Sequence, residues 1–166
     1  MNIVGIVGWR NSGKTTLITR LIEFFSERGI SVSTIKHAHH AFDIDHPGKD
    51  SFLHREAGAH EVLVASARRW ALMHEVGEDD EPLLEEHIAR LAPVDLVIVE
   101  GYKRHPHIKL EVRREGQEAS DLAPEDTDIM AIIADYPIPD STIPILPLND
   151  PPAVARFISE FFKLAV

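Results

Sequence analysis

Hydrophobic residues along the chain recur in two patterns. Short apolar runs rich in Val and Ile, bounded by Gly, Pro or charged residues, predict buried strands at residues 2–7, 30–36, 95–99, 129–134 and 143–146. Apolar residues spaced by three and four positions predict helices at 14–28, 82–91 and 151–164. Because parallel strands need crossover connections, this alternation predicts an α/β fold, a mostly parallel β-sheet with helices on both faces.

Two segments depart from this alternation. Residues 61–65 and 70–76 predict strands that pair as a hairpin, preceded by a short helix at 51–58. We expect this hairpin to add antiparallel strands at one edge of the sheet. Residues 108–113 alternate between polar and apolar side chains, which predicts an outer strand. No stretch has the length and composition of a linker, so we expect one domain over residues 1–166.

Composition narrows the function classes. The 166 residues carry 17 Lys and Arg against 27 Asp and Glu, a net charge of -10, which disfavours general nucleic-acid binding but leaves room for one small anion site. The absence of cysteine excludes disulfides, thiolate metal sites and cysteine nucleophiles. No apolar run reaches 18 residues, and the first run is too short for a signal peptide. We therefore expect a cytoplasmic protein with no membrane segment.

Residues 8–15, GWRNSGKT, fit the P-loop pattern G-x-x-x-x-G-K-[ST] without deviation. The motif follows a predicted buried strand and opens a predicted helix, so we expect a P-loop NTPase fold. Backbone N–H groups and the helix N-terminus would then surround the phosphates, with Lys14 neutralising the β- and γ-phosphates as the candidate catalytic residue. The predicted phosphate-binding residues are Gly8, Asn11, Ser12, Gly13, Lys14, Thr15 and Thr16.

A P-loop also predicts a Mg²⁺ site, for which the hydroxyl of Thr15 is a suitable hard oxygen ligand. Glu100 directly follows the apolar strand at 95–99, at the strand's carboxyl end, where ligands collect in parallel sheets. Asp50 is a second metal candidate, because it closes the loop after the second strand. Asp43 and Asp45 in the same loop are equally open to a metal role or an ordinary polar one.

Two polar clusters leave alternatives open. His37, His39, His40 and His46 lie close to two aspartates and either hold a transition metal or form a polar loop at the mouth of the phosphate site. The loop interpretation is favoured, because no helical spacing of the histidines fixes a metal geometry. The basic stretch at 103–109 either holds a second phosphate-bearing molecule or is a solvated edge strand.

Further motifs extend the pattern beyond the P-loop. They comprise residues 8–16 (GWRNSGKTT), 35–40 (IKHAHH), 43–45 (DID), 47–51 (PGKDS), 57–59 (AGA), 69–72 (RWAL) and 99–103 (VEGYK), with 134–135 (AD) and 149–150 (ND) further along. In this order they resemble the molybdopterin-guanine dinucleotide biosynthesis protein B family, and the resemblance covers nearly the whole chain.

This resemblance implies a GTP-binding protein with weak Mg²⁺-dependent GTPase activity, usually a homodimer. Members of the family assist molybdopterin guanylyltransferase, the enzyme that joins GMP to molybdopterin. The implied ligands are GTP, Mg²⁺ and molybdopterin. Residues 8–16 would bind phosphates, Thr15 and Glu100 the metal, and residues 37–50 would face the nucleotide.

Guanine recognition has no motif of its own in this chain. The N-K-x-D pattern that reads guanine in many GTPases is absent, and Asp135 after the strand at 129–134 is the candidate base reader. No residue is evident that would orient a water for attack, so slow hydrolysis is expected. The alternatives are a small-molecule kinase on a P-loop scaffold and an interaction protein that only senses nucleotide.

Overall fold

The computed structural model describes residues 1–38, 42–77, 81–117 and 121–166, so His39 and His40 lie outside the described residues. The chain forms two units, one of Met1–His37 with Leu84–Val166 and one of Ala38–Leu83. Each is described separately below. The single domain predicted for residues 1–166 stays a prediction.

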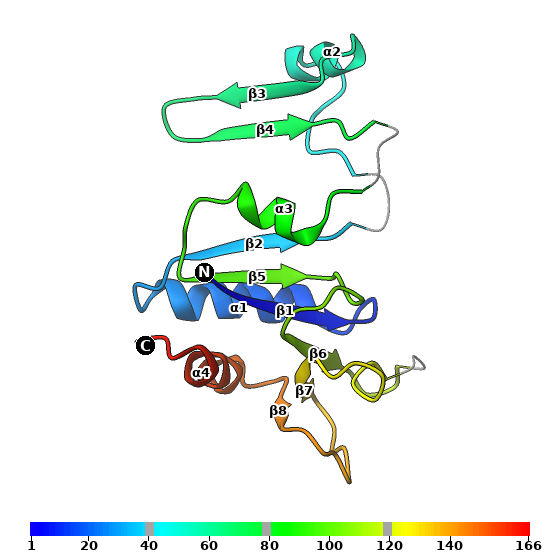
Figure 1. The fold of residues 1–166 in the computed structure, drawn as a ribbon, viewed down its shortest axis with the longest axis vertical. Helices are drawn as coiled ribbons and strands as arrows, with labels where there is room; N and C mark the ends of the chain where they lie inside the picture. The colour runs from blue at the N-terminus through cyan, green and yellow to red at the C-terminus, as the bar shows by residue number, and fades with distance from the viewer. Residues whose placement is uncertain (39–41, 78–80, 118–120) are drawn as a thin grey trace. The chain divides into compact units, whose positions relative to one another are not determined.

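Six strands form the sheet of the first unit in the order β2-β5-β1-β6-β7-β8 (Figure 1). Neighbouring strands pair in parallel throughout the described residues. The strands are β1 (Asn2–Gly8), β2 (Val32–Lys36), β5 (Leu96–Glu100), β6 (Lys109–Arg113), β7 (Ile129–Ala134) and β8 (Ile145–Pro147). The predicted parallel α/β fold is confirmed, and the carboxyl ends of its strands meet at one edge.

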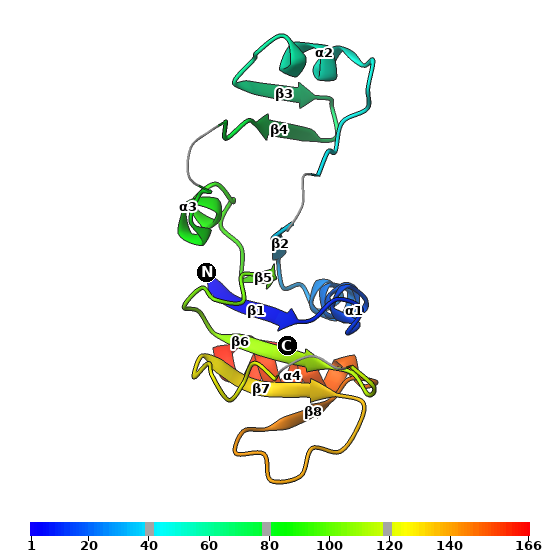
Figure 2. The ribbon, with the colours of Figure 1, turned by 90° about the vertical axis from the view of Figure 1, so that its right-hand side faces the viewer.

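Helices cover both faces of this sheet, as predicted. Apolar side chains of α1 (Lys14–Ser26) and α4 (Pro151–Phe162) pack on one face, in a core with β1, β5, β6 and β7. The short helix α3 (Leu84–Ala89) packs on the other face against Val97 and Val99 of β5. Figure 2 shows α3 and α1 on opposite sides of the sheet. In the described part of the chain, no helix is long and apolar enough to cross a membrane.

The strand predicted to be an outer one, β6, lies inside the sheet between β1 and β7, and all five of its residues are buried. Leu110 and Val112 join the apolar core. Lys109, Glu111 and Arg113 face the opposite way, because side chains alternate along a strand. Their charges do not need solvent, since acidic residues and backbone groups downstream neutralise them, and the outer-strand prediction was wrong for this reason.

Residues 121–128 supply the partners of these buried charges. Lys109 Nζ lies 2.8 Å from Asp126 Oδ2, and Arg113 lies 2.8 Å from Glu111 and 2.9 Å from Asp121. The Glu111 carboxylate also accepts the backbone N–H groups of Leu122 and Ala123 at 2.9 Å. The segment is thereby held over the half of this face that carries β6, by ion pairs instead of a helix.

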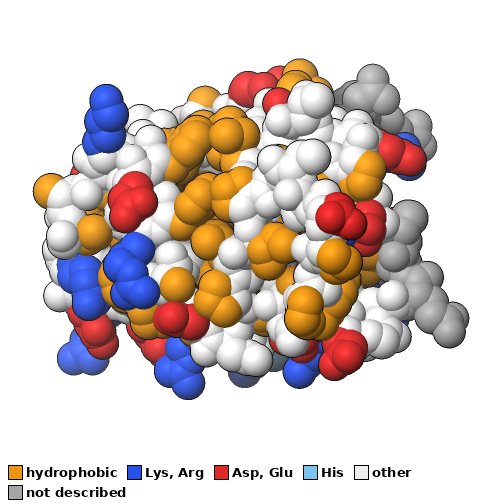
Figure 3. All heavy atoms as spheres, turned by 90° about the horizontal axis from the view of Figure 1, so that it is seen from below, with side chains coloured by type: hydrophobic (Ala, Val, Ile, Leu, Met, Phe, Trp, Pro, Cys, Tyr) orange, Lys and Arg blue, Asp and Glu red, His pale blue; other side chains and the backbone are white. Residues whose placement is uncertain are grey.

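The edge strand β8 has three residues and is flanked by Pro144, while Pro147 ends it. Proline has no N–H to offer a further strand, so this edge of the sheet is protected against extension. Figure 3 shows hydrophobic side chains gathered at this end of the first unit. Ile145 of β8 and Phe161 of α4 are among the exposed hydrophobic residues.

The second unit contains α2 (Asp50–Glu56) and the antiparallel pair β3 (Glu61–Ala65) and β4 (Trp70–His74). The predicted hairpin is confirmed, but it forms its own two-stranded sheet and adds no strand to the edge of the parallel one. A short turn dictates local pairing from sequence, whereas docking onto another sheet depends on side-chain complementarity that spacing does not encode. Val62 is buried in this unit, whereas Leu63, Trp70 and Leu72 are exposed.

Replacing Glu111 by Ala is expected to destabilise the protein by about 3 kcal/mol, because buried Arg113 would keep only Asp121 of its two carboxylate partners and two N–H groups would lose their acceptor. Urea unfolding followed by circular dichroism measures this loss. The matched control is Glu23→Ala, which removes an exposed ion pair with Arg20 and should cost less than about 0.5 kcal/mol. Equal stability of the two variants would contradict the structural role of Glu111.

Candidate functional site

The loop between β1 and α1 has the backbone geometry that its glycines were predicted to provide. Gly8 has φ +143° and Gly13 has φ +96°, values that side chains rarely tolerate. A Cβ atom on Gly8 would lie 2.5 Å from the carbonyl oxygen of Val112, so only glycine lets this loop pass so close to β6. Ser12 of the loop is fully buried. The strand–loop–helix context of the P-loop is therefore present.

A cleft of about 500 Å³ opens beside this loop. Four of the residues around it are cations and one is a carboxylate, so the cleft is locally positive on a chain with a net charge of -10. Such a cleft attracts anions. Its lining residues are Arg10, Asn11, Gly13, Lys14, Thr15, Thr16, Lys36, Glu100 and Arg114.

Most of the predicted site residues converge on this cleft. Gly8 and Ser12 belong to the loop but do not line the cleft, whereas the other predicted P-loop residues line it together with Glu100. Asp50 is the first residue of α2 in the second unit, and its metal role stays a prediction. Sequence reasoning missed Lys36 and Arg114 as cleft residues. Their signal was their position at the carboxyl ends of two strands, the criterion that found Glu100.

Lys14 holds its ammonium inside the loop. Its Nζ donates to the carbonyl oxygen of Trp9 at 2.6 Å and lies 3.4 Å from Ser12 Oγ. Burial lowers the pKa of Lys14 below its ordinary value, and the carboxylate of Glu100 opposes that shift. A phosphate oxygen that replaced the Trp9 carbonyl would bring full negative charge to a partly desolvated cation, a favourable exchange.

The predicted metal residues Thr15 and Glu100 do meet. Thr15 Oγ1 donates to Glu100 Oε1 at 3.3 Å. Both are hard oxygen donors, and two adjacent ligands of an octahedral Mg²⁺ lie about 3.0 Å apart, given Mg–O distances of about 2.1 Å. The pair therefore fits a Mg²⁺ ion with a small adjustment. Lys36 Nζ lies 3.3 Å from the same oxygen of Glu100.

Asp135, the candidate base reader, follows β7 at the same sheet edge. Its Oδ1 accepts the backbone N–H of Glu115 at 2.8 Å, and its Oδ2 lies 3.6 Å from Nε of Arg114. It is not among the residues that line the cleft. Its carboxylate thus orients a cleft arginine, and the reading of guanine by Asp135 stays a prediction.

The basic stretch after Glu100 is largely engaged in contacts within the protein. Lys103 Nζ lies 3.8 Å from the centre of the Trp9 ring, and His105 Nε2 lies 3.0 Å from Glu85 of α3. His107 packs against Gly5 of β1, and burial lowers its pKa. With Lys109 buried as well, the stretch is not a solvated edge strand, whereas Arg104 is exposed and the binding of a second phosphate-bearing molecule stays a prediction.

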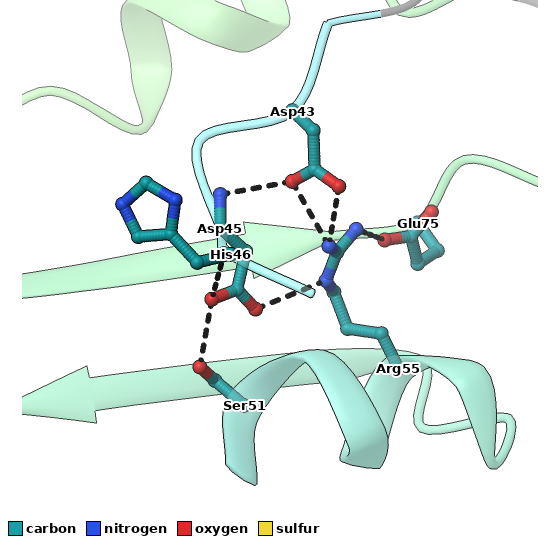
Figure 4. Close-up of polar contacts among 6 residues, drawn as sticks. All are labelled: Asp43, Asp45, His46, Ser51, Arg55 and Glu75. Atoms are coloured by element: carbon teal, nitrogen blue, oxygen red, sulfur yellow. Dashed lines mark hydrogen bonds and ion pairs between the residues drawn. The ribbon is translucent and has the colours of Figure 1, made fainter. Parts of the chain in front are cut away.

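Asp43 and Asp45 are occupied by an arginine (Figure 4). Arg55 of α2 donates to both carboxylate oxygens of Asp43 at 2.9 Å, lies 3.5 Å from Asp45, and donates to Glu75 at 2.9 Å. The N–H of Asp45 and the Arg55 guanidinium lower the pKa of Asp43. These carboxylates stabilise the fold of the second unit.

The described part of the histidine cluster does not form a metal site. His37 stacks on Tyr102 with 4.6 Å between ring centres, and the backbone N–H of His46 donates to Asp45 Oδ1 at 2.9 Å. Across the described residues, no group of three or more His, Cys, Asp or Glu side chains is arranged to hold a metal ion. The place of this loop at the mouth of the phosphate site stays a prediction.

Residues 3–135 match the family model of Molybdopterin guanine dinucleotide synthesis protein B, MobB. The chain belongs to this family. It is 36% identical to the molybdopterin-guanine dinucleotide biosynthesis adapter protein of Escherichia coli K12, over 97% of this chain and 93% of that protein. It is 38% identical to the adapter protein of the same name from Haemophilus influenzae, over 96% and 88% of the two chains.

The fold leads to the same family. The crystal structure of Bacillus subtilis MobB matches with a TM-score of 0.77 and 29% identity, covering 96% of this chain and 98% of that one. The resemblance that the sequence motifs carry is thereby confirmed. Family membership places the chain among the proteins of molybdopterin guanine dinucleotide synthesis.

Proposed function

We propose that this chain is an adapter that binds GTP and Mg²⁺ in its P-loop cleft and assists the attachment of GMP to molybdopterin by a guanylyltransferase. The observation that carries the nucleotide part is the cleft, in which Lys14, three further cations and the loop backbone surround a space beside Thr15 and Glu100. The adapter part is supported by the names of the relatives. The proposal includes the cytoplasmic location expected from the sequence.

Thr15 and Glu100 would hold the Mg²⁺ ion, which would neutralise phosphate charge when bound. Lys14 would bind the β- and γ-phosphates from inside the loop. Of the described residues that line the cleft, Glu100 is the one carboxylate, and none is a glutamine or histidine that would orient a water. Slow hydrolysis of GTP is expected from this composition. Slow hydrolysis suits an adapter whose role depends on bound GTP more than on its hydrolysis.

The proposal includes a homodimer. Leu63 and Leu72 are paired across the hairpin, and Trp70 is two residues before Leu72, so the three side chains share one face of the two-stranded sheet. They are 59%, 44% and 68% exposed. A two-stranded sheet is marginally stable alone, and an apolar face of this kind favours burial against a partner. A second copy of the chain provides a surface of the same chemistry.

Lys14→Ala is expected to weaken GTP binding by about 10- to 100-fold, because the variant loses a charge-assisted contact to phosphate. Isothermal titration calorimetry with GTP, GDP and ATP, each with and without Mg²⁺, measures the change and the base preference together. Arg20→Ala on the exposed face of α1 is the matched control. Unchanged affinity in Lys14→Ala would refute the site, and equal binding of ATP and GTP by the parent chain would refute the guanine assignment.

Glu100→Gln is expected to remove most of the increase in GTP affinity that Mg²⁺ brings, because an amide oxygen carries no charge for the ion. GDP binding without Mg²⁺ should stay within about threefold of the parent, since Glu100 would not contact the diphosphate. Titrations in Mg²⁺ and in a chelator measure both effects. An equal Mg²⁺ response in variant and parent would remove Glu100 from the metal.

Leu72→Asp is expected to convert a dimer into monomers, because it places a charge in an apolar interface at a cost of about 2 kcal/mol per copy in lost burial alone. Sedimentation velocity at several concentrations measures the mass. Leu72→Met keeps the apolar surface and should keep the dimer. A dimer that persists in Leu72→Asp, with unchanged circular dichroism, would exclude this face as the interface.

A further inference from the structure

Lys36 is the last residue of β2 and pairs in register with Glu100, the last residue of β5. Its Nζ lies 3.3 Å from Glu100 Oε1, and its side chain lines the P-loop cleft. The same oxygen accepts the hydroxyl of Thr15 at 3.3 Å. One carboxylate oxygen is therefore shared by a lysine and by the threonine proposed to bind Mg²⁺.

The ion pair between Lys36 and Glu100 is not a strong structural contact. The Lys36 side chain is 61% exposed, whereas that of Glu100 is 16% exposed. An ion pair with one such exposed partner contributes little to stability, because solvent screens it and ordering the lysine costs entropy. Lys36 can therefore leave Glu100 at little cost, while Glu100 keeps its place in the cleft.

Mg²⁺ and the Lys36 ammonium would compete for the same carboxylate oxygen of Glu100. A divalent ion bound at Oε1 would repel the nearby ammonium of Lys36. It would also bind the lone pairs of the carboxylate oxygen that now face that ammonium. The displaced Lys36 ammonium would remain within the cleft. Thr15 and Glu100 would hold a Mg²⁺ that neutralises phosphate charge, so the ammonium displaced from Glu100 would lie close to the phosphates of the nucleotide.

Lys14 is a different kind of cation in the same cleft. Its Nζ donates to the Trp9 carbonyl and approaches Ser12, both within the loop itself, so it contacts whatever phosphate the loop encloses. Lys36 approaches from a neighbouring strand, on the side of Glu100. The two lysines thus reach the cleft from different elements, and their contributions should be separable by the length of the phosphate chain.

We propose that Lys36 is an exchangeable cation that neutralises Glu100 in the absence of Mg²⁺ and contacts the terminal phosphate when a Mg²⁺-bound nucleoside triphosphate enters. This exchange makes Lys36 a determinant of triphosphate over diphosphate binding. The inference rests on the proposed nucleotide binding in the P-loop cleft, but it does not depend on which base is bound.

Calorimetric titration of the full chain with GTP and with GDP, both in Mg²⁺, tests the exchange. Lys36→Met should lower GTP affinity about tenfold and change GDP affinity less than about threefold. Lys36→Arg keeps the charge and should restore GTP affinity to within about threefold of the parent. Arg20→Met removes one positive charge away from the cleft and should change neither affinity. Lys36→Gln replaces Lys36→Met if that variant does not fold.

Equal losses of GTP and GDP affinity in Lys36→Met would overturn the inference, since they would show a general charge effect. Unchanged GTP affinity would overturn it as well and leave the pair with Glu100 as a surface contact only. In either case GTP binding by the parent chain would keep the proposed function intact. A parent chain that binds no nucleoside triphosphate would refute the proposed function and this inference together.

Discussion

Parallel hydrogen bonding of β1 to β5 on one side and to β6 on the other aligns the carboxyl ends of three strands. The P-loop, Glu100 and Arg114 leave the sheet at these ends, and β2 adds Lys36 through its pairing with β5. Residues far apart in sequence thereby share one cleft. The close passage of Gly8 over the Val112 carbonyl holds the loop against the sheet, so the strands fix the position of the cleft.

The buried charges of β6 and the charges of the cleft differ in their partners. On β6, Lys109, Glu111 and Arg113 are buried and have partners in or near the sheet. In the cleft, cations outnumber carboxylates and contact protein oxygens at the Trp9 carbonyl and Glu100. The first set holds a segment in place, whereas the second lies around a cleft that attracts anions. The net charge of the chain does not tell the buried set of β6 apart from the set in the cleft.

Much of this arrangement could be predicted from sequence, because local rules govern it. The P-loop pattern, the apolar strand before Glu100 and the turn of the hairpin each depend on residues close together in the chain. The position of β6 could not be predicted, because alternating polar residues look the same whether water or an acidic segment 8 to 19 residues later neutralises them. Lys36 and Arg114 were missed because their position at the carboxyl end of a strand points to the P-loop only once the strand order is known.

The unit of Ala38–Leu83 interrupts the chain between β2 and α3. Because β2 pairs with β5, the edge of the parallel sheet closes only after this whole segment has been synthesised and its ends brought together. The entropy lost in closing a loop rises with its length, and the loops that join β1 to β5 and β1 to β6 contain this same segment, so none of these pairings forms before the segment has been synthesised. The cleft, which needs the carboxyl ends of all these strands, is therefore expected to assemble late in folding.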